Sequence, residues 1–468
     1  MQHSSPTHPA GAIDPDLLPP EILFLCRHLA TAGGDAWLVG GCVRDLMLHI
    51  NPKDYDLEVY GLTEAALSDA LQQLGRCEMV GKQFGVHKLW FRQMEIDVAL
   101  PRTESKSGSG HRGFVVHTDP HLTPEIATLR RDFTINAMMY DPLQHRLLDL
   151  HGGQSDLDEG ILRHVSPAFA EDPLRPLRAM QFAARFRFHL APETAAMCRT
   201  LVAEADTLPA SRIWIEWQKW SHARSPSCGL IALHDSGWLA CYPELQALQQ
   251  CPQDPRWHPE GDVWVHTLQV VDQAAEMAKK HHLSRPDREH LLFAALCHDL
   301  GKPETTVQQP DGRIGSPGHS KAGVPLTRRL LQRMHAPGAI GKIVVPLVQE
   351  HITHLFGDPT ARAVRRLAWR LQPAHIELWE MLVEADASGR APAPPSRPAL
   401  PWLQLAQSMQ QHRQAAARIV DGDMLMQLGV EPGPVLGEML AKAYQAQLNG
   451  EFNDAQGARL WCIIHIGS

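Results

Sequence analysis

Two aspartates, Asp54 and Asp56, stand two positions apart at the start of an apolar run. In a β-strand, residues i and i+2 share a face, so the two carboxylates would point the same way with their Cα atoms about 7 Å apart. Asp97, in the alternating run MEIDVAL, is the candidate third carboxylate. Like charges held this close favour a divalent cation, and such ions serve phosphoryl-transfer chemistry.

Gly40 and Gly41 lie upstream, where we expect an apolar strand to end and a helix carrying Arg44 and Asp45 to begin. Glycines let backbone N–H groups approach a phosphate closely, and a helix N-terminus favours an anion. The same pattern also fits an ordinary strand-to-helix turn. This feature alone therefore does not establish a phosphate site.

A second set of residues combines imidazole with carboxylate. His298 and Asp299 are adjacent in an apolar helical run that ends at Gly301. The partners expected elsewhere in the chain are His266 and Asp386, with His319 and His351 as further candidates. This mixture of donors suits a divalent transition metal (Ni, Mn, Co or Zn) better than Ca²⁺. Any one of these histidines alone is more often a surface or core residue, so the interpretation depends on the whole series.

The hydrophobic pattern indicates which elements position these residues. Residues 36–100 alternate short β-like runs (AWLVGG, DYDLEVYGL, HKLWF, MEIDVAL) with turns and one helical segment (CVRDLMLHI), which predicts an α/β head. From about residue 155 onward, segments such as RPLRAMQFAARF and IWIEWQKW predict helices. We therefore expect an α+β chain with a head followed by helical parts.

Five motifs follow one another over residues 36–190: LVGGCVRD, KDYDLEVYG, RTESKSGSG, LRRDFTINAM and EDPLRPLRAMQFAARF. In this order they resemble the class II tRNA nucleotidyltransferases, the CCA-adding enzymes and their poly(A) polymerase relatives. The resemblance implies Mg²⁺ at Asp54 and Asp56. The nucleotide-binding residues that it implies are Gly41, Arg44, Arg131, Asp172, Arg175 and Arg178.

The resemblance makes residues 171–175 a protein template for the incoming base. On a helix, Asp172 and Arg175 would be i,i+3 neighbours that present an acceptor beside a fork of donors, which can read a Watson–Crick edge. A surface ion pair is the alternative. Residues 105–113 (SKSGSGHRG) resemble the family's flexible loop, although their composition equally fits a plain connection.

The ordered histidine and aspartate series resembles the HD phosphohydrolases, and the segment RWHPEGDVWVHTL resembles the start of that domain in some bacterial tRNA nucleotidyltransferases. This resemblance implies an all-helical fold and metal-dependent phosphodiesterase and phosphatase activity. The expected parts of the chain are an N-terminal tail and first helix (1–30), a nucleotidyltransferase head (31–155), a helical neck with the template (156–255), an HD domain (256–390), a proline-rich linker (391–401) and a helical tail (402–468). The tail is expected to serve packing rather than tRNA contact.

Composition excludes several classes of protein. With 44% hydrophobic and 21% charged residues, the 468-residue chain is not disordered throughout and exceeds one small module. A net charge of −8 leaves RNA contact to local clusters, for which we name Arg362, Arg365, Arg366 and Arg370, although a solvated helix face explains them almost as well. The nine cysteines lack CxxC spacing, and neither a signal peptide nor an apolar run of about 20 residues occurs. We expect a cytoplasmic protein with no membrane partner.

These expectations combine into one function: addition of CCA to the tRNA 3′ end from CTP and ATP, with a second metal-dependent activity at the HD site. Three sister activities of the same fold remain open, namely poly(A), CC or A addition. A protein of another class, an HD phosphohydrolase with a degenerate RNA-binding head, also remains open. The sequence leaves the oligomeric state open, with a homodimer as one candidate.

Overall fold

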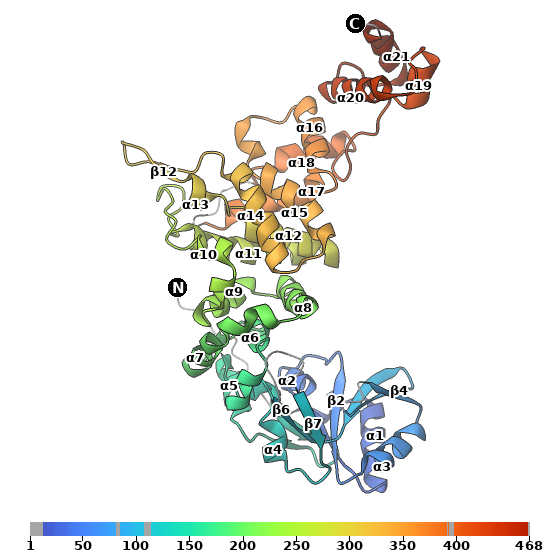
Figure 1. Ribbon diagram of the computed structural model, residues 1–468, viewed down its shortest axis with the longest axis vertical. Helices are drawn as coiled ribbons and strands as arrows, with labels where there is room; N and C mark the ends of the chain where they lie inside the picture. The colour runs from blue at the N-terminus through green and yellow to red at the C-terminus, as the bar shows by residue number, and fades with distance from the viewer. Residues whose placement is uncertain (1–12, 81–84, 107–113, 391, 393–396, 467–468) are drawn as a thin grey trace. The chain divides into compact units, whose positions relative to one another are not determined.

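The computed structural model describes residues 13–80, 85–106, 114–390, 392 and 397–466. The chain divides into two compact units. The N-terminal unit comprises Met1–Trp220 with Cys228–Cys241, and the C-terminal unit comprises Ser221–Ser227 with Tyr242–Ser468. This division falls inside the predicted neck, residues 156–255. Figure 1 shows the long strands in the blue to teal part of the chain and helices in most of the rest, which confirms the α+β class.

A seven-stranded mixed sheet forms the head, in the order β3-β4-β5-β2-β1-β8-β9. Its strands are β1 (Asp35–Val39), β2 (Tyr55–Tyr60), β3 (Arg76–Val80), β4 (Val86–Phe91), β5 (Met94–Ala99), β8 (Met139–Asp141) and β9 (Arg146–Leu148). The four β-like runs read from the sequence correspond to β1, β2, β4 and β5. Because β2 and β5 are parallel neighbours, their polar residues meet in register.

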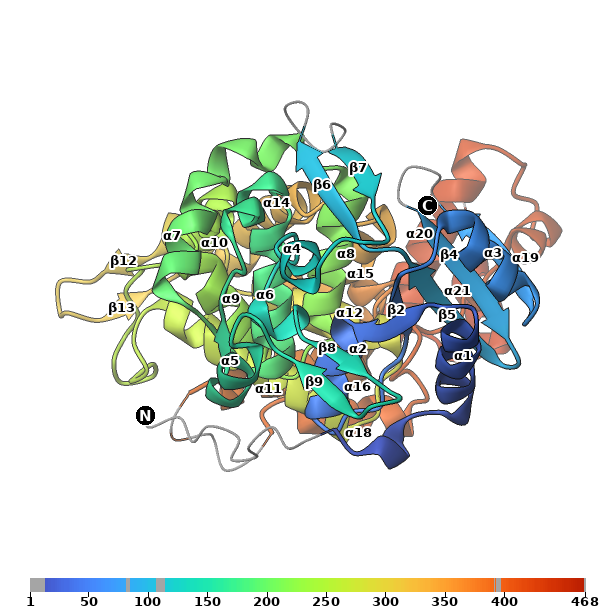
Figure 2. The ribbon, with the colours of Figure 1, turned by 90° about the horizontal axis from the view of Figure 1, so that it is seen from below.

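Helices α1 (Pro20–Thr31), α2 (Gly41–Met47) and α3 (Glu64–Gln72) pack against this sheet, and α4 (Pro124–Thr128) follows a separate ribbon. The ribbon pairs β6 (Arg102–Lys106) with β7 (Phe114–Thr118), as Figure 2 shows. It includes the first two residues of the predicted flexible loop. The remainder of that loop, residues 107–113, lies outside the described residues.

The helices that follow the head are α5 (Gly153–Glu159), α6 (Arg175–Phe186), α7 (Pro192–Thr200), α8 (Ala210–Ser221) and α9 (Pro226–Asp235), with the short parallel pair β10 (Ile161–Leu162) and β11 (His189–Leu190). The helices predicted for RPLRAMQFAARF and IWIEWQKW correspond to α6 and α8. The prediction that Asp172 and Arg175 share a helix is wrong, because α6 begins only at Arg175 and Asp172 is extended (φ −113°, ψ 103°). Pro173 disfavours a helical conformation in the residue before it.

The HD part is a helical bundle whose central helix, α12, carries an unbroken buried run from Leu291 to Cys297. Its helices are α10 (Pro243–Gln246), α11 (Val263–Lys280), α12 (Arg285–Cys297), α13 (Lys302–Thr305), α14 (His319–Arg333), α15 (Gly338–Glu350), α16 (Ala361–Leu371), α17 (Ile376–Ser388) and α18 (Leu400–Ser408). One short hairpin, β12 (Val307–Gln308) and β13 (Ile314–Gly315), interrupts them. Helices α11, α15 and α17 pack around α12 and bring their ends together.

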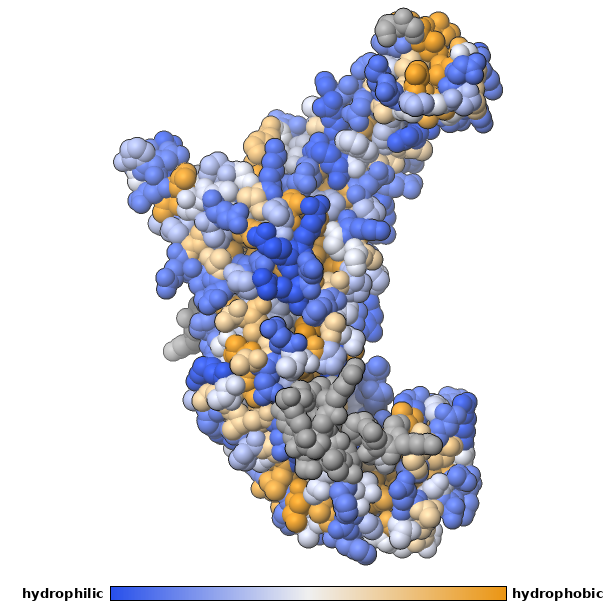
Figure 3. All heavy atoms as spheres, in the orientation of Figure 1, coloured by the Kyte–Doolittle hydropathy of each residue, from blue (hydrophilic) through white to orange (hydrophobic). Residues whose placement is uncertain are grey.

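The predicted linker is shorter than expected at its C-terminal end, because α18 begins at Leu400 and packs against α16 and α17. The rings of Trp402 and Trp379 lie 5.9 Å apart there. The tail helices are α19 (Gly422–Gln427), α20 (Pro434–Asn449) and α21 (Ala455–His465), which enclose a small core of their own. Figure 3 shows apolar surface on this tail. The other domain boundaries stay predictions.

Two further observations bear on the sequence reasoning. The nine cysteines are free thiols, and burial raises the pKa of Cys42 and Cys198 to about 12, so these two are poor nucleophiles. No helix in the described part of the chain is both long enough and apolar enough to cross a lipid bilayer.

Candidate functional site

The structure places two of the three predicted carboxylates side by side. Asp56 is the second residue of β2, and Asp97 is its register partner on β5. Asp54 is exposed and immediately precedes β2. Lys88, on β4, is the register partner of Asp97 on the other side, with Nζ 3.7 Å from Asp97 Oδ1. The i,i+2 spacing thus begins one residue before the strand.

The electrostatics of these carboxylates favour a cation. Burial raises the pKa of Asp56, the nearby Asp97 and Asp54 raise it further, and Arg131 opposes them. Asp97 Oδ1 is buried without a hydrogen-bond partner. An all-oxygen donor set with an unsatisfied buried oxygen fits a hard ion such as Mg²⁺. Among the described residues, however, the groups of three whose ligand atoms already lie within 4.8 Å all belong to the C-terminal unit.

A cavity of about 190 Å³ opens beside these strands, lined by Asp56, Asp97, Glu58, Arg130 and Arg131 among others. Gly40, with φ +75°, stands immediately before α2 and close to two of the side chains that line the cavity. A Cβ at Gly40 would lie 3.3 Å from Nη1 of Arg131 and 3.7 Å from Oδ2 of Asp56. Glycine is therefore required both by the backbone conformation and by the close approach of the guanidinium.

Arg44, predicted to bind the triphosphate, lies on α2 and is buried. Its guanidinium donates to Asp45 Oδ1 at 2.7 and 2.9 Å and to Asn136 Oδ1, and it lies 4.6 Å from the ring centre of Phe186. Burial lowers its pKa, while the adjacent Asp45 raises it. Arg185 also contacts Asp45, at 3.1 Å. Arg44 therefore belongs to an internal network, and the residues that line the cavity do not include it.

The two template residues are joined by a backbone hydrogen bond, from the N–H of Arg175 to the Asp172 carbonyl at 3.1 Å, while their side chains also contact other residues. Asp172 accepts from the backbone N–H of Leu174 at 3.0 Å, and its Oδ2 lies 3.0 Å from Nη2 of Arg212. Arg175 donates to the carbonyl oxygens of Ala168 (2.9 Å) and Arg130 (2.6 Å). These side-chain contacts thus differ from the expected pair of Asp172 and Arg175 on one helix.

Arg178 is anchored by Asp132, which accepts from its Nε at 2.8 Å. Burial opposes ionisation of Asp132, but Arg178 and a hydrogen bond from Asn136 outweigh it and lower its pKa to about 2. The sequence analysis named neither Asp132 nor Asn136. Both lie in the quoted motif LRRDFTINAM, four residues apart, and this spacing was the available signal.

The histidines and aspartates of the second set converge from separate helices. His266 lies in α11 and Asp386 in α17, His298 and Asp299 follow α12 directly, His319 is the first residue of α14, and His351 follows α15. His266 Nε2 lies 3.0 Å from Asp386 Oδ1, and His298 Nε2 lies 3.1 Å from Asp299 Oδ2. His319 Nε2 lies 3.5 Å from Asp299 Oδ1 and 3.2 Å from His351 Nε2. All six predicted residues meet in one cluster.

The chemistry of this cluster fits a bound transition metal. His298 Nε2 is buried and, although it lies 3.1 Å from Asp299 Oδ2, makes no hydrogen bond of regular geometry. Burial disfavours protonation of His266, but hydrogen bonds to Asp386 and Glu260 outweigh it and raise its pKa to about 9. Burial and the neighbouring histidines lower the pKa of His351 to about 3. Buried imidazole nitrogens that face carboxylate oxygens form the donor set that a borderline ion prefers.

The sequence analysis missed three residues that support this cluster. Glu260 Oε1 is 2.8 Å from His266 Nδ1 and 2.9 Å from His258 Nδ1. Lys302 Nζ lies 2.7 Å from Asp299 Oδ2. Glu260 and His258 stand in the quoted segment RWHPEGDVWVHTL, and Lys302 directly follows the run that ends at Gly301. Their polar or charged side chains, so close to the predicted ligands, were the available signal.

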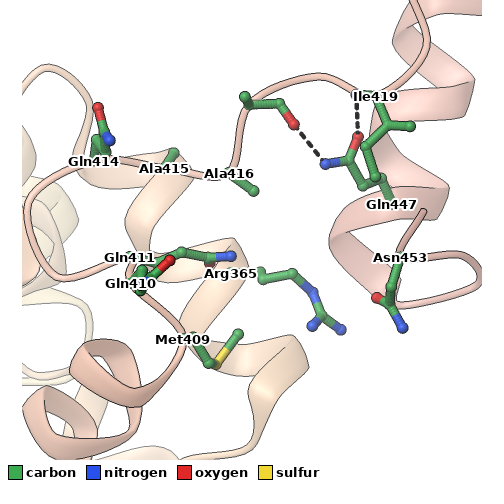
Figure 4. A pocket seen from close by; sticks show the side chains of 11 residues that line it. Arg365, Met409, Gln410, Gln411, Gln414, Ala415, Ala416, Ile419, Gln447 and Asn453 are labelled. Carbon is green, nitrogen blue, oxygen red and sulfur yellow. Dashed lines mark hydrogen bonds between the residues drawn. The ribbon is translucent and has the colours of Figure 1, made fainter. Parts of the chain in front are cut away.

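The predicted arginine cluster on α16 proves to be divided. Arg365 donates through Nε to the Leu448 carbonyl at 3.0 Å, and Arg366 donates to Asn449 at 2.7 Å. Arg370 pairs with Glu350 at 2.9 Å. Figure 4 shows Arg365 in a cavity of about 350 Å³ lined largely by glutamine and asparagine side chains. Arg365 and Arg366 thus fasten α20 to α16, and neither metal-site candidate lines this cavity.

Comparison with known proteins gives the same two parts. The family model described as poly A polymerase head domain matches residues 36–163, and the model described as HD domain matches residues 263–385. The chain therefore joins a nucleotidyltransferase head to an HD domain, and both families are metal-dependent.

Two individual relatives show to which family of such two-domain proteins the chain belongs. The Multifunctional CCA protein of Xanthomonas campestris pv. campestris (strain B100) is 39% identical over 419 residues, covering 87% of this chain and 96% of that protein. The protein of the same name from Nitrosococcus oceani is 40% identical over 365 residues, covering 76% and 85%. This chain belongs to the multifunctional CCA protein family, whose members are tRNA nucleotidyltransferases.

Solved structures agree on the fold. The Bacillus stearothermophilus CCA-adding enzyme, determined in complex with CTP, has a TM-score of 0.65 at 22% identity, covering 96% of this chain and 97% of that one. The Thermotoga maritima CCA-adding enzyme, complexed with tRNA, has a TM-score of 0.55 at 18% identity, covering 96% and 97%. The likeness extends over the tail as well as the head.

Proposed function

We propose that this protein adds CCA to the 3′ end of tRNA from CTP and ATP without a nucleic-acid template. The observation that carries the proposal is the register pairing of Asp56 with Asp97 in a cavity that Arg131 also lines. In the reaction, the tRNA 3′ hydroxyl attacks the α-phosphorus of the nucleotide and pyrophosphate leaves. Mg²⁺, when bound at Asp54 and Asp56 with Asp97 beside them, stabilises the charge that develops there.

The chain's own residues bind the triphosphate and select the base. Gly41, at the start of α2, and Arg131 hold the triphosphate. Arg44, which lies on the same helix, supports triphosphate binding indirectly, through its hydrogen bonds to Asp45 and Asn136. Asp172 and Arg175, with Arg178 beside them, select the base by its edge. Because the side chains of Asp172 and Arg175 contact other residues, we propose that each contacts a different atom of the base.

The test is incubation of the purified protein with tRNA that ends before CCA, Mg²⁺, and CTP and ATP, separately and together. Sequencing of the added ends distinguishes the activities. Ends extended only by C, only by A, or by a run of A would assign one of the sister activities instead. An absence of any incorporation would favour an HD phosphohydrolase with a degenerate RNA-binding head.

We also propose a second activity at the HD cluster: metal-dependent hydrolysis of phosphodiesters and phosphomonoesters, for example of 2′,3′-cyclic nucleotides, with Ni, Mn, Co or Zn. The convergence of His266, His298, Asp299 and Asp386, together with the buried His298 Nε2, supports it. The test is release of the monoester product across these metals and Mg²⁺. A protein that is inactive with every metal would make this cluster structural. A homodimer stays a prediction.

A further inference from the structure

Glu58 is a further carboxylate in the nucleotidyltransferase cavity. It lies on β2 two residues after Asp56, is only 2% exposed, and lines the cavity. Its Oε1 accepts a hydrogen bond from the Tyr60 hydroxyl at 2.7 Å. Its Oε2 accepts from Nη2 of Arg130 at 2.9 Å and from Nη2 of Arg131 at 3.3 Å. Two guanidinium groups therefore share one carboxylate oxygen.

A buried carboxylate is costly unless it is paired, and in a cavity that receives a triphosphate its charge would repel the ligand. The two arginines offset the cost of burying the carboxylate, because they supply the compensating charge. The repulsion of the triphosphate is offset only if the same arrangement also improves the binding of the phosphates by another residue. The orientation of Arg131 provides that improvement.

With Nη2 of Arg131 held by Glu58, Nη1 is directed to the opposite side of the guanidinium. There it lies 3.3 Å from the position of a Cβ on Gly40, and Asp56 Oδ2 lies 3.7 Å from the same position. Nη1 thus occupies the corner between the N-terminus of α2 and the catalytic carboxylate. A triphosphate bound beside Asp56 would therefore come close to Nη1 of Arg131.

The segment that carries both arginines is also held from its other side. The carbonyl oxygen of Arg130 accepts from Nη2 of Arg175, the template arginine, at 2.6 Å. Glu58 and Arg175 therefore clamp one short segment between them. Fixing a guanidinium before the ligand arrives lowers the entropic cost of binding.

We propose that Glu58 is a positioning residue for the nucleoside triphosphate: it holds Arg131 so that Nη1 contacts the phosphates of the incoming nucleotide. This inference rests on the proposed function of the head. It assigns to Glu58 no contact with the nucleotide itself, so the loss of Glu58 acts through Arg131.

The test measures CTP binding by calorimetry and kcat and KM for addition to truncated tRNA. Glu58→Gln removes the charge but keeps the size, and we expect the dissociation constant and KM for CTP to rise about tenfold with kcat changed less than about twofold. Tyr60→Phe is the matched control, because it removes only the hydrogen bond to Oε1. We expect it to bind CTP as the wild type does.

Two results would overturn the inference: unchanged CTP affinity in Glu58→Gln, or an equal loss in Tyr60→Phe. In an Arg131→Lys background, Glu58→Gln should cause little further loss, since both changes remove the same contact; a full tenfold further loss would contradict action through Arg131. If Glu58→Gln does not fold, as judged by thermal unfolding, Glu58→Asp decides, because it keeps the charge but withdraws the carboxylate from Arg131 by one methylene: wild-type affinity for CTP overturns the inference and weakened affinity supports it. A wild-type protein that neither binds CTP nor extends tRNA would overturn the proposed function itself.

Discussion

Replacing Glu260 by glutamine tests how the HD cluster is organised. Burial raises the pKa of Glu260, but hydrogen bonds from His266 and His258 outweigh it and lower the pKa to about 2. The carboxylate is therefore ionised at physiological pH and can only accept hydrogen bonds. Both imidazoles must present Nδ1–H to it, which leaves Nε2 of His266, 3.0 Å from Asp386, as the nitrogen that would bind a metal in place of its own proton.

The magnitude follows from the type of hydrogen bond. A bond to an ionised group contributes roughly 1.5–3 kcal/mol, and a neutral one roughly 0.5–1.5 kcal/mol. In Glu260→Gln the acceptor oxygen remains but its charge is lost, so about 1.4 kcal/mol of orientation at His266 disappears. This corresponds to about a tenfold loss of metal affinity, at the low end of the range that outer carboxylates usually contribute.

The assay is calorimetric titration of Ni²⁺ and Mn²⁺ into metal-free protein. Glu244→Gln is the matched control, because Glu244 is also buried in the C-terminal unit but pairs with Arg333, outside the cluster. We expect the control to bind metal with wild-type affinity. Wild-type affinity in folded Glu260→Gln would refute the reasoning, and an equal loss in the control would trace the effect to general destabilisation.

Three further predictions address the two sites. Asp56→Ala should abolish nucleotide addition while the fold persists, because it removes a ligand and relieves repulsion between carboxylates; near wild-type incorporation of labelled CTP would contradict the assignment. Asp172→Ala or Arg175→Ala should weaken discrimination among CTP, ATP, GTP and UTP by about 1–3 kcal/mol, measured as ratios of kcat/KM, and an unchanged preference would count against the template role. His298→Ala or Asp299→Ala should abolish phosphohydrolysis and spare CCA addition; loss of addition in a folded variant would show that the two sites depend on each other.

Much of this protein can be predicted from local spacing. The alternation of apolar residues around Asp97 and the glycine turn at Gly40 depend on interactions within a few residues, so β5 and the start of α2 were predictable. The adjacent His298 and Asp299 likewise marked the end of a buried helix. Where a local rule was applied without its exceptions, it failed: Pro173 keeps Asp172 out of the helix that carries Arg175.

Tertiary structure alone decided which of these side chains act together. His266 and Asp386 are 120 positions apart and meet because α11 and α17 pack against each other as well as on α12. The partners of Glu58, 72 and 73 positions away, follow from the folding of the segment after α4 back onto the sheet. Such pairings depend on how apolar faces pack over long chain distances, and no spacing within a motif encodes them. The sequence by itself therefore determined which donor groups are present, and the packing of helices and strands determined which of them lie together.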